Sequence, residues 1–230
     1  AQNKTQAEST AQLVFQKLVL GSENTIAHLD IGTERSIEKL MLSDVEDFYT
    51  RHYSPSSATL VIVSDLPKEK ILTELSVFGD WNGRAREPKT IESSPEINET
   101  RIFLVDKPNA AQSEIRIGGK GPHYDATGDY YRAGLANYVL GGAFNSRINL
   151  NLREDKGYTY GARLQFVGYK DYGMTVASTG VRTDVTAPSI VELLKEIRGY
   201  VKEGITEEEL IFLKNAIGQR DARRFETPSQ

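Results

Sequence analysis

The sequence of 230 residues contains no cysteine. Disulfide bonds and thiolate chemistry are therefore excluded as sources of stability or catalysis. The absence does not identify a cellular compartment, because many proteins of either redox environment lack cysteine.

Long apolar runs and a basic excess are also missing. No run approaches the roughly 20 apolar residues that a helix needs to cross a bilayer, so the sequence predicts no membrane span. Lys and Arg number 28 against 32 Asp and Glu, giving a net charge of −4. Nucleic acid is therefore not expected as the main partner, because no basic excess neutralises phosphates. The polar stretch Ala1–Thr10 lacks the layout of a signal peptide.

Histidine is scarce, with three residues in the whole chain: His28, His52 and His123. None has the neighbouring Glu and His of the H-E-x-x-H or H-x-x-E-H zinc motifs. No G-x-S-x-G nucleophile motif and no phosphate-binding glycine loop is present. The sequence therefore predicts no metal ligand and no complete catalytic site in this chain.

What is present is a soluble, globular composition, with 39% hydrophobic and 26% charged residues. Apolar periodicity and capping signals predict helices. The expected helices are 5–20, 43–53 with Ser43 as its cap, 68–78, 129–140, 146–155, 188–203, and a last one that begins at the capping box Thr206–Glu209.

Alternating or continuous apolar runs predict strands. The expected strands are 58–63, 101–105, 113–118, 160–169 and 172–181, with the last two forming a hairpin around Lys170-Asp171. Helices, strands and hairpins in this order indicate an α+β fold with a largely antiparallel sheet. Residues 84–96 are predicted to be a linker between two halves, 1–83 and 97–230.

The pair Gly141-Gly142 follows an expected helix and has two interpretations. Glycines there can cap the helix C-terminus. They can also let another backbone approach closely, as a peptide substrate would. The residues alone do not choose between them.

Several segments, taken in order and spacing, resemble one family, the insulinase/pitrilysin-type zinc metallopeptidases. They are Gly32–Ile37, Leu42–Tyr49, His52–Pro55, Ala58–Val63, Phe78–Trp81, Leu140–Ile148, Leu152–Tyr160 and Gly204–Leu210. The resemblance extends over about residues 11–227. It implies an α/β roll whose mostly antiparallel sheet is flanked by helices. Residues 1–83 would be the latter half of one roll, and 97–230 the opening part of the next.

The resemblance also implies a divided enzyme. The family's catalytic domain carries H-x-x-E-H and a zinc ion, and a second domain closes over the peptide and contributes an Arg/Tyr pair. Residues 97–230 resemble the Arg/Tyr-bearing part of the second domain, and H-x-x-E-H is absent from the chain, so we expect it to be inactive alone and to need a partner domain or subunit that holds the zinc. The resemblance to bacterial members suggests a parent in the periplasm or cell envelope, a compartment that the residues themselves do not decide.

Carried over by position, Arg153 and Tyr160 match the Arg/Tyr pair. Arg153 would hold a carbonyl or carboxylate of the peptide, which its planar guanidinium suits. Tyr160 would donate its hydroxyl to the oxyanion, and Asn145, Ser146, Gly141 and Gly142 would line the cleft. A structural alternative stays open, because Tyr160 alternates in phase with the apolar residues of its strand, and Arg153 can be a surface ion-pair partner. Tyr158 departs from the small residue that the family often has there, and it competes for the hydroxyl role.

Two further readings of the chain stay open beside the enzyme part. One is a non-catalytic scaffold or assembly subunit of the same family, in which Arg153 and Tyr160 are structural. The other is a stand-alone peptide-binding module. Because each half-roll alone would expose a sheet edge, we also expect the two halves to complement each other in a permuted roll, within one chain or by exchange between two copies.

Overall fold

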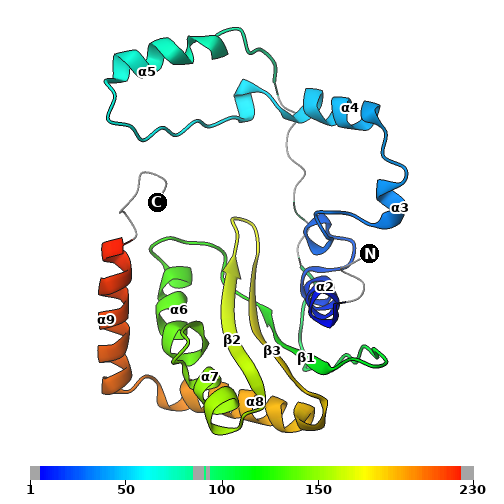
Figure 1. Ribbon diagram of the computed structural model, residues 1–230, viewed down its shortest axis with the longest axis vertical. Helices are drawn as coiled ribbons and strands as arrows, with labels where there is room; N and C mark the ends of the chain where they lie inside the picture. Colours follow the sequence, from blue (N-terminus) through cyan, green and yellow to red (C-terminus); the bar gives the residue numbers. More distant parts are fainter. Residues whose placement is uncertain (1–5, 85–90, 92–93, 224–230) are drawn as a thin grey trace. The chain divides into compact units, whose positions relative to one another are not determined.

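The computed structural model describes residues 6–84, 91 and 94–223 (Figure 1). The chain divides into two compact units. The first, which we call the sheet unit, comprises Ala1–Asp30 and Ile91–Ala216; the second unit comprises Ile31–Thr90 and Ile217–Gln230.

A three-stranded antiparallel sheet forms the centre of the sheet unit, with strand order β1-β3-β2. Its strands are β1 (Gln112–Lys120), β2 (Thr159–Gly168) and β3 (Gly173–Arg182). The predicted hairpin joins β2 to β3, and the Tyr169 N–H donates to the Tyr172 carbonyl at 2.8 Å across its turn. The α+β class with an antiparallel sheet is thereby confirmed.

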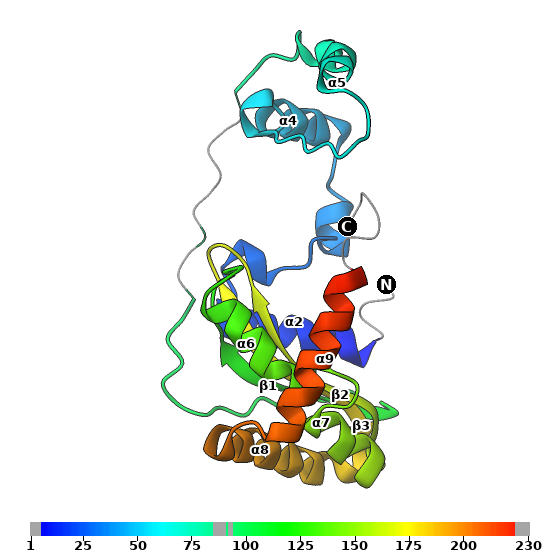
Figure 2. The ribbon, with the colours of Figure 1, turned by 90° about the vertical axis from the view of Figure 1, so that its left-hand side faces the viewer.

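Helices cover both faces of this sheet (Figures 1 and 2). Alternate residues of a strand point to opposite faces, and in β3 Val176 packs with α2 whereas Ala177 joins a second apolar cluster. The helical elements of the sheet unit are α2 (Ala7–Leu20), η1 (Thr25–Ala27), α6 (Asp129–Asn137), the π-helical η4 (Tyr138–Gly142), α7 (Arg147–Asn149), the π-helical η5 (Leu150–Asp155), η6 (Thr183–Val185) and α8 (Thr186–Glu203). The last helix, α9 (Glu207–Arg223), belongs to this unit as far as Ala216.

The start of α9 follows its predicted capping box. The Glu209 N–H donates to the Thr206 hydroxyl at 3.2 Å, and the Thr206 N–H donates to the Glu209 carboxylate at 2.8 Å. These two bonds satisfy N–H groups that a helix start leaves without intrahelical partners.

Two of the predicted strands are not formed, so these predictions are wrong. The runs 58–63 and 101–105 form no strand, and Val61, Ile102 and Leu104 are 80%, 93% and 94% exposed. Apolar, β-branched runs have the composition of strands, but a strand exists only where a neighbouring strand supplies the hydrogen-bonded ladder. Among the described residues no such neighbour lies beside either run.

The second unit consists of short helical elements: α3 (Glu34–Ile37), α4 (Leu42–His52), η2 (Pro55–Ser57), α5 (Lys68–Glu74) and η3 (Leu75–Phe78). The cap expected at Ser43 is wrong, because α4 begins at Leu42 and the Asp44 carboxylate accepts the Met41 N–H at 2.9 Å. Of the described residues 31–84, only Ser54 is buried. This stretch therefore presents its apolar side chains without a core of its own.

The first half of the chain contributes a helix to the sheet unit: α2 packs against β1 and β3. No strand from the described part of 1–83 joins the sheet. The expected boundaries, with a linker at 84–96, and an exchange of half-domains between two copies stay predictions. No helix among the described residues has the length and apolar character to cross a membrane.

Candidate functional site

Tyr160 lies in an irregularity of β2. The pairing of β2 with β3 shifts register between Thr159 and Ala162, so the strand carries a bulge at this point. Tyr160 is 91% exposed, whereas Ala162 and Leu164 are 1% and 5% exposed. Regular alternation would place these three side chains on one buried face; the bulge breaks the phase and turns the Tyr160 ring to solvent.

Hydroxyl groups on the two strands hold the bulge in place. The Thr159 hydroxyl donates to the Gly180 carbonyl at 2.7 Å and accepts the Gly161 N–H at 3.0 Å. The buried Thr179 hydroxyl donates to the Gly161 carbonyl at 3.0 Å. Side-chain hydroxyls thus satisfy the backbone groups that the bulge removes from the hydrogen-bonded ladder. These bonds fix the backbone on both sides of Tyr160.

The neighbouring Tyr158 has a different environment. Its side chain is half-buried against the sheet unit's larger apolar cluster, and its N–H donates to the Leu152 carbonyl at 2.9 Å. Of the two tyrosines that the sequence places in competition, only Tyr160 has a ring open to solvent.

Arg153 lies on the π-helical segment η5. Its guanidinium carbon is 4.4 Å from the centre of the Phe144 ring, and its Nε is 3.5 Å from the Glu154 carboxylate. A guanidinium stacked on an aromatic face keeps its N–H edge free for planar acceptors. Segments of π-helix are rare and frequently occur at functional sites.

The other four predicted residues divide between surface and interior. Gly142 and Asn145 are exposed, whereas Gly141 is buried and Ser146 is 0% exposed. An added Cβ at Gly141 would come 2.6 Å from the Leu164 backbone, so the close approach at this glycine is made by β2 of the same chain. In this structure Ser146 does not reach the surface.

Asn149 was not predicted. Its side-chain amide is 4% exposed and makes two hydrogen bonds: Nδ2 donates to the Phe144 carbonyl at 2.7 Å, and Oδ1 accepts the Ala162 N–H at 2.9 Å. One side chain thus links the turn under Arg153 to the residue that ends the Tyr160 bulge. The sequence offers little signal for it, because Asn149 is one of three asparagines, with Asn145 and Asn151, in a stretch that mixes polar and apolar residues.

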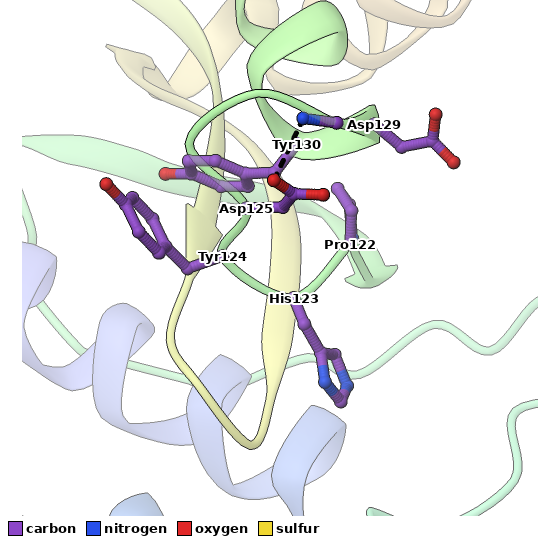
Figure 3. A pocket seen from close by; sticks show the side chains of 7 residues that line it. Pro122, His123, Tyr124, Asp125, Asp129 and Tyr130 are labelled. Carbon is purple, nitrogen blue, oxygen red and sulfur yellow. Dashed lines mark hydrogen bonds between the residues drawn. The ribbon is translucent and has the colours of Figure 1, made fainter.

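A shallow cavity of about 420 Å³ lies at the start of α6 (Figure 3). Asp125 accepts the N–H groups of Thr127 and Gly128 at 3.0 and 2.9 Å, which lower the pKa of its carboxyl. The rings of Tyr124 and Tyr130 are 5.4 Å apart, and the His123 ring points away from Asp125. None of the six predicted residues lines this cavity, and its Asp125 carboxylate is engaged by N–H groups at the start of α6.

In the part of the chain that the structure describes, the donor set does not fit a zinc ion. Among the described residues no group of three or more His, Asp or Glu side chains is placed to hold a metal. His52, the histidine on a helix, lies with its ring centre 4.5 Å from that of Phe48.

The amino-acid sequence of this chain matches one protein family and several known proteins. The family described as "Peptidase M16 inactive domain" matches residues 39–217. The chain is 23% identical over 217 residues to "Non-peptidase homolog YmxG" of Helicobacter pylori, covering 93% of this chain and 49% of that protein. It is 25% identical over 181 residues to "Uncharacterized zinc protease YmxG" of Bacillus subtilis, covering 78% of this chain and 43% of that protein.

The fold agrees with these sequence matches. The crystal structure of a peptidase M16 inactive domain from Pseudomonas fluorescens superposes with a TM-score of 0.84 at 23% identity, over 94% of this chain and 52% of that one. This chain thus spans about half the length of the relatives it matches. The insulinase-type resemblance and the roll fold expected from the sequence are confirmed: the chain belongs to the family of peptidase M16 inactive domains.

Proposed function

We propose that this chain is the substrate-binding region of a zinc metalloendopeptidase that cleaves peptides or unfolded proteins. Membership of the inactive-domain family supports a role beside a catalytic domain rather than as one. The observation that carries the proposal is the bulge in β2, which turns the Tyr160 side chain out of the sheet's apolar face. A tyrosine needed only for packing would be buried there.

In this proposal Tyr160 donates its phenolic O–H to the oxyanion that forms when the scissile carbonyl is attacked. A donor aimed at that oxygen lowers the barrier because the oxygen's negative charge grows toward the transition state. Among the described residues no hydrogen bond or ring contact engages the Tyr160 side chain, so its O–H is available to a ligand.

Arg153 binds the peptide through a backbone carbonyl or a carboxylate. Its side chain is 34% exposed and backed by the Phe144 ring, so the guanidinium is both restrained and accessible. Gly142 and Asn145, which are exposed on the same connection as Phe144, contribute the adjoining peptide-contacting surface.

The partner that supplies the zinc would be an H-x-x-E-H-bearing domain or subunit. The exposed apolar side chains of residues 31–84 support such a partner, because large apolar patches are characteristic of association surfaces. Phe48 and Val61, at 57% and 80% exposure, are examples on α4 and on the extended run after it.

Cleavage of a quenched fluorescent peptide mixture tests this function. With zinc present, the chain alone should be silent, and activity should appear when the H-x-x-E-H-bearing region of its parent or paired subunit is added. Arg153→Ala or Tyr160→Phe should lower that activity strongly, by about 100- to 1,000-fold for the loss of an oxyanion donor, and leave a measurable remainder. Zinc-dependent cleavage by the chain alone would overturn the proposal.

A second function, that of a non-catalytic scaffold, is favoured by one observation: the Helicobacter pylori relative bears the name of a non-peptidase homolog. Silence in both conditions of the peptide assay, with a stable complex between the two regions, would select this alternative. In that case Arg153→Ala and Tyr160→Phe should leave assembly unchanged.

A further inference from the structure

The side chain of Asn149 joins the two halves of the candidate site. On one side its Nδ2 donates to the Phe144 carbonyl at 2.7 Å, and the Arg153 guanidinium carbon lies 4.4 Å from the centre of the Phe144 ring. On the other side its Oδ1 holds the Ala162 N–H at 2.9 Å, where the bulge that carries Tyr160 ends. No other described side chain bonds both segments.

We propose that Asn149 is a positioning residue that fixes the distance between Arg153 and Tyr160. This inference rests on the proposed function, because it assigns a task only if those two side chains act on the same peptide. Asn149 touches neither the substrate nor the reacting atoms; it acts through the Phe144 turn and the β2 bulge.

The chemistry of the amide suits this task. A primary amide offers a donor and an acceptor on opposite corners of one planar group, and the two backbone groups that Asn149 meets require one of each. Aspartate keeps the acceptor but loses the donor, and alanine loses both. Because the side chain is 4% exposed, water does not readily replace the lost partners.

A double-mutant cycle with Tyr160 tests the proposal in the full-length parent together with its catalytic region, using the fluorescent peptide mixture. Asn149→Ala should lower kcat/KM by about 10- to 100-fold, the loss typical of a misplaced group. In a Tyr160→Phe background the same substitution should cost less than about threefold, because residues that act through one another are not additive.

Asn149→Asp separates the two bonds. It keeps the acceptor for the Ala162 N–H, so we expect kcat to change little while KM rises with the loosened Phe144 turn. Hydrogen exchange in the same proteins supplies a second measurement that does not depend on catalysis: Asn149→Ala should speed exchange of the Ala162 amide.

Asn137 is the matched control. It is also a buried asparagine, 8% exposed, and its Nδ2 donates to the Leu164 carbonyl of the same strand at 2.7 Å. Asn137→Ala should lower the free energy of unfolding. Its effect on kcat/KM, however, should simply multiply with that of Tyr160→Phe, as expected for residues that act independently.

Independent effects of Asn149→Ala and Tyr160→Phe, or an unchanged Ala162 exchange rate, would overturn the positioning role while leaving the proposed function intact. If Tyr160→Phe itself has no effect on cleavage, the proposed function fails, and the positioning role fails with it.

Discussion

Arg147 and Glu209 form a two-pronged ion pair in which Nε and Nη2 each lie 2.5 Å from a carboxylate oxygen. The same guanidinium donates to the Gly204 carbonyl at 2.9 Å and lies 5.0 Å from the centre of the Tyr200 ring. The pair therefore ties α7, which leads into the candidate site, to the first turn of α9, and the bond to Gly204 ties it to the end of α8. Its two side chains are 19% and 21% exposed, so solvent screens the pair only in part.

This ion pair predicts a pH dependence of stability. Hydrogen bonds from Arg147 lower the pKa of the Glu209 carboxyl below its ordinary value. A carboxyl with a lowered folded-state pKa contributes stability that is fully present above its unfolded-state value and is lost as the pH falls through the folded-state value. Glu209→Gln should therefore cost about 1–3 kcal/mol of unfolding free energy at pH 7 and little at pH 2, as measured by urea unfolding.

Glu208→Gln is the control for this prediction, since it removes the same charge from the same first turn of α9. Glu208 is exposed, and no described bond joins it to Arg147. It should change the unfolding free energy by less than about 0.5 kcal/mol. Equal losses in the two variants would mean that helix charge, and not the pair, stabilises this junction.

The bulge in β2 predicts opposite behaviour for two tyrosines that are two residues apart. Tyr160→Ala should change the unfolding free energy by less than about 0.5 kcal/mol, because the side chain is 91% exposed. Tyr158→Ala should cost about 2 kcal/mol, because its ring packs against the apolar cluster. Urea midpoints of the two variants, compared with the wild type, check this, and the reverse order would contradict the position of the bulge.

Sequence patterns predicted those elements whose hydrogen-bond partners lie close by in the sequence. The hairpin of β2 and β3 and the Thr206–Glu209 cap depend on neighbours that are close in sequence, so period-2 alternation and capping chemistry were sufficient. The runs 58–63 and 101–105 have equally strong strand composition, yet their ladders require partners that are not among the described strands. Composition alone does not reveal whether such a partner exists.

The candidate site was predictable in its residues but not in its geometry. Resemblance to a family selected Arg153 and Tyr160 by position. The bulge could not be read from the sequence, because Tyr160, Ala162 and Leu164 alternate as in a regular strand, and only the pairing with β3 reveals the inserted residue. Asn149 was missed for a similar reason: its two partners are backbone groups, which leave no mark on residue type.

Gly141 provides a test of why the glycine pair is present. An added Cβ would lie 2.6 Å from both the Cβ and the backbone nitrogen of Leu164, so Gly141→Ala should cost about 1–3 kcal/mol by forcing η4 away from β2. Gly134→Ala is the control, since no atom lies within 4 Å of its added Cβ in the exposed part of α6. It should stabilise the protein by about 0.5–1 kcal/mol through helix propensity. Calorimetric unfolding distinguishes the two, and a neutral Gly141→Ala would leave the substrate-approach interpretation as the better reason for this glycine.

The exposed apolar run 58–63 predicts where a partner binds. Val61 is 80% exposed and forms no ladder, so Val61→Lys should cost the chain's own fold little. The substitution should weaken binding to the H-x-x-E-H-bearing region about tenfold, because a charge would have to be buried where an apolar side chain is expected. Thr59→Lys adds the same charge at an exposed polar position two residues before Val61 and is the control. Sedimentation of the mixed regions measures both effects. Equal binding of the two variants would mean that this run is not part of the interface, and the partner would then have to be sought on the apolar face of α4.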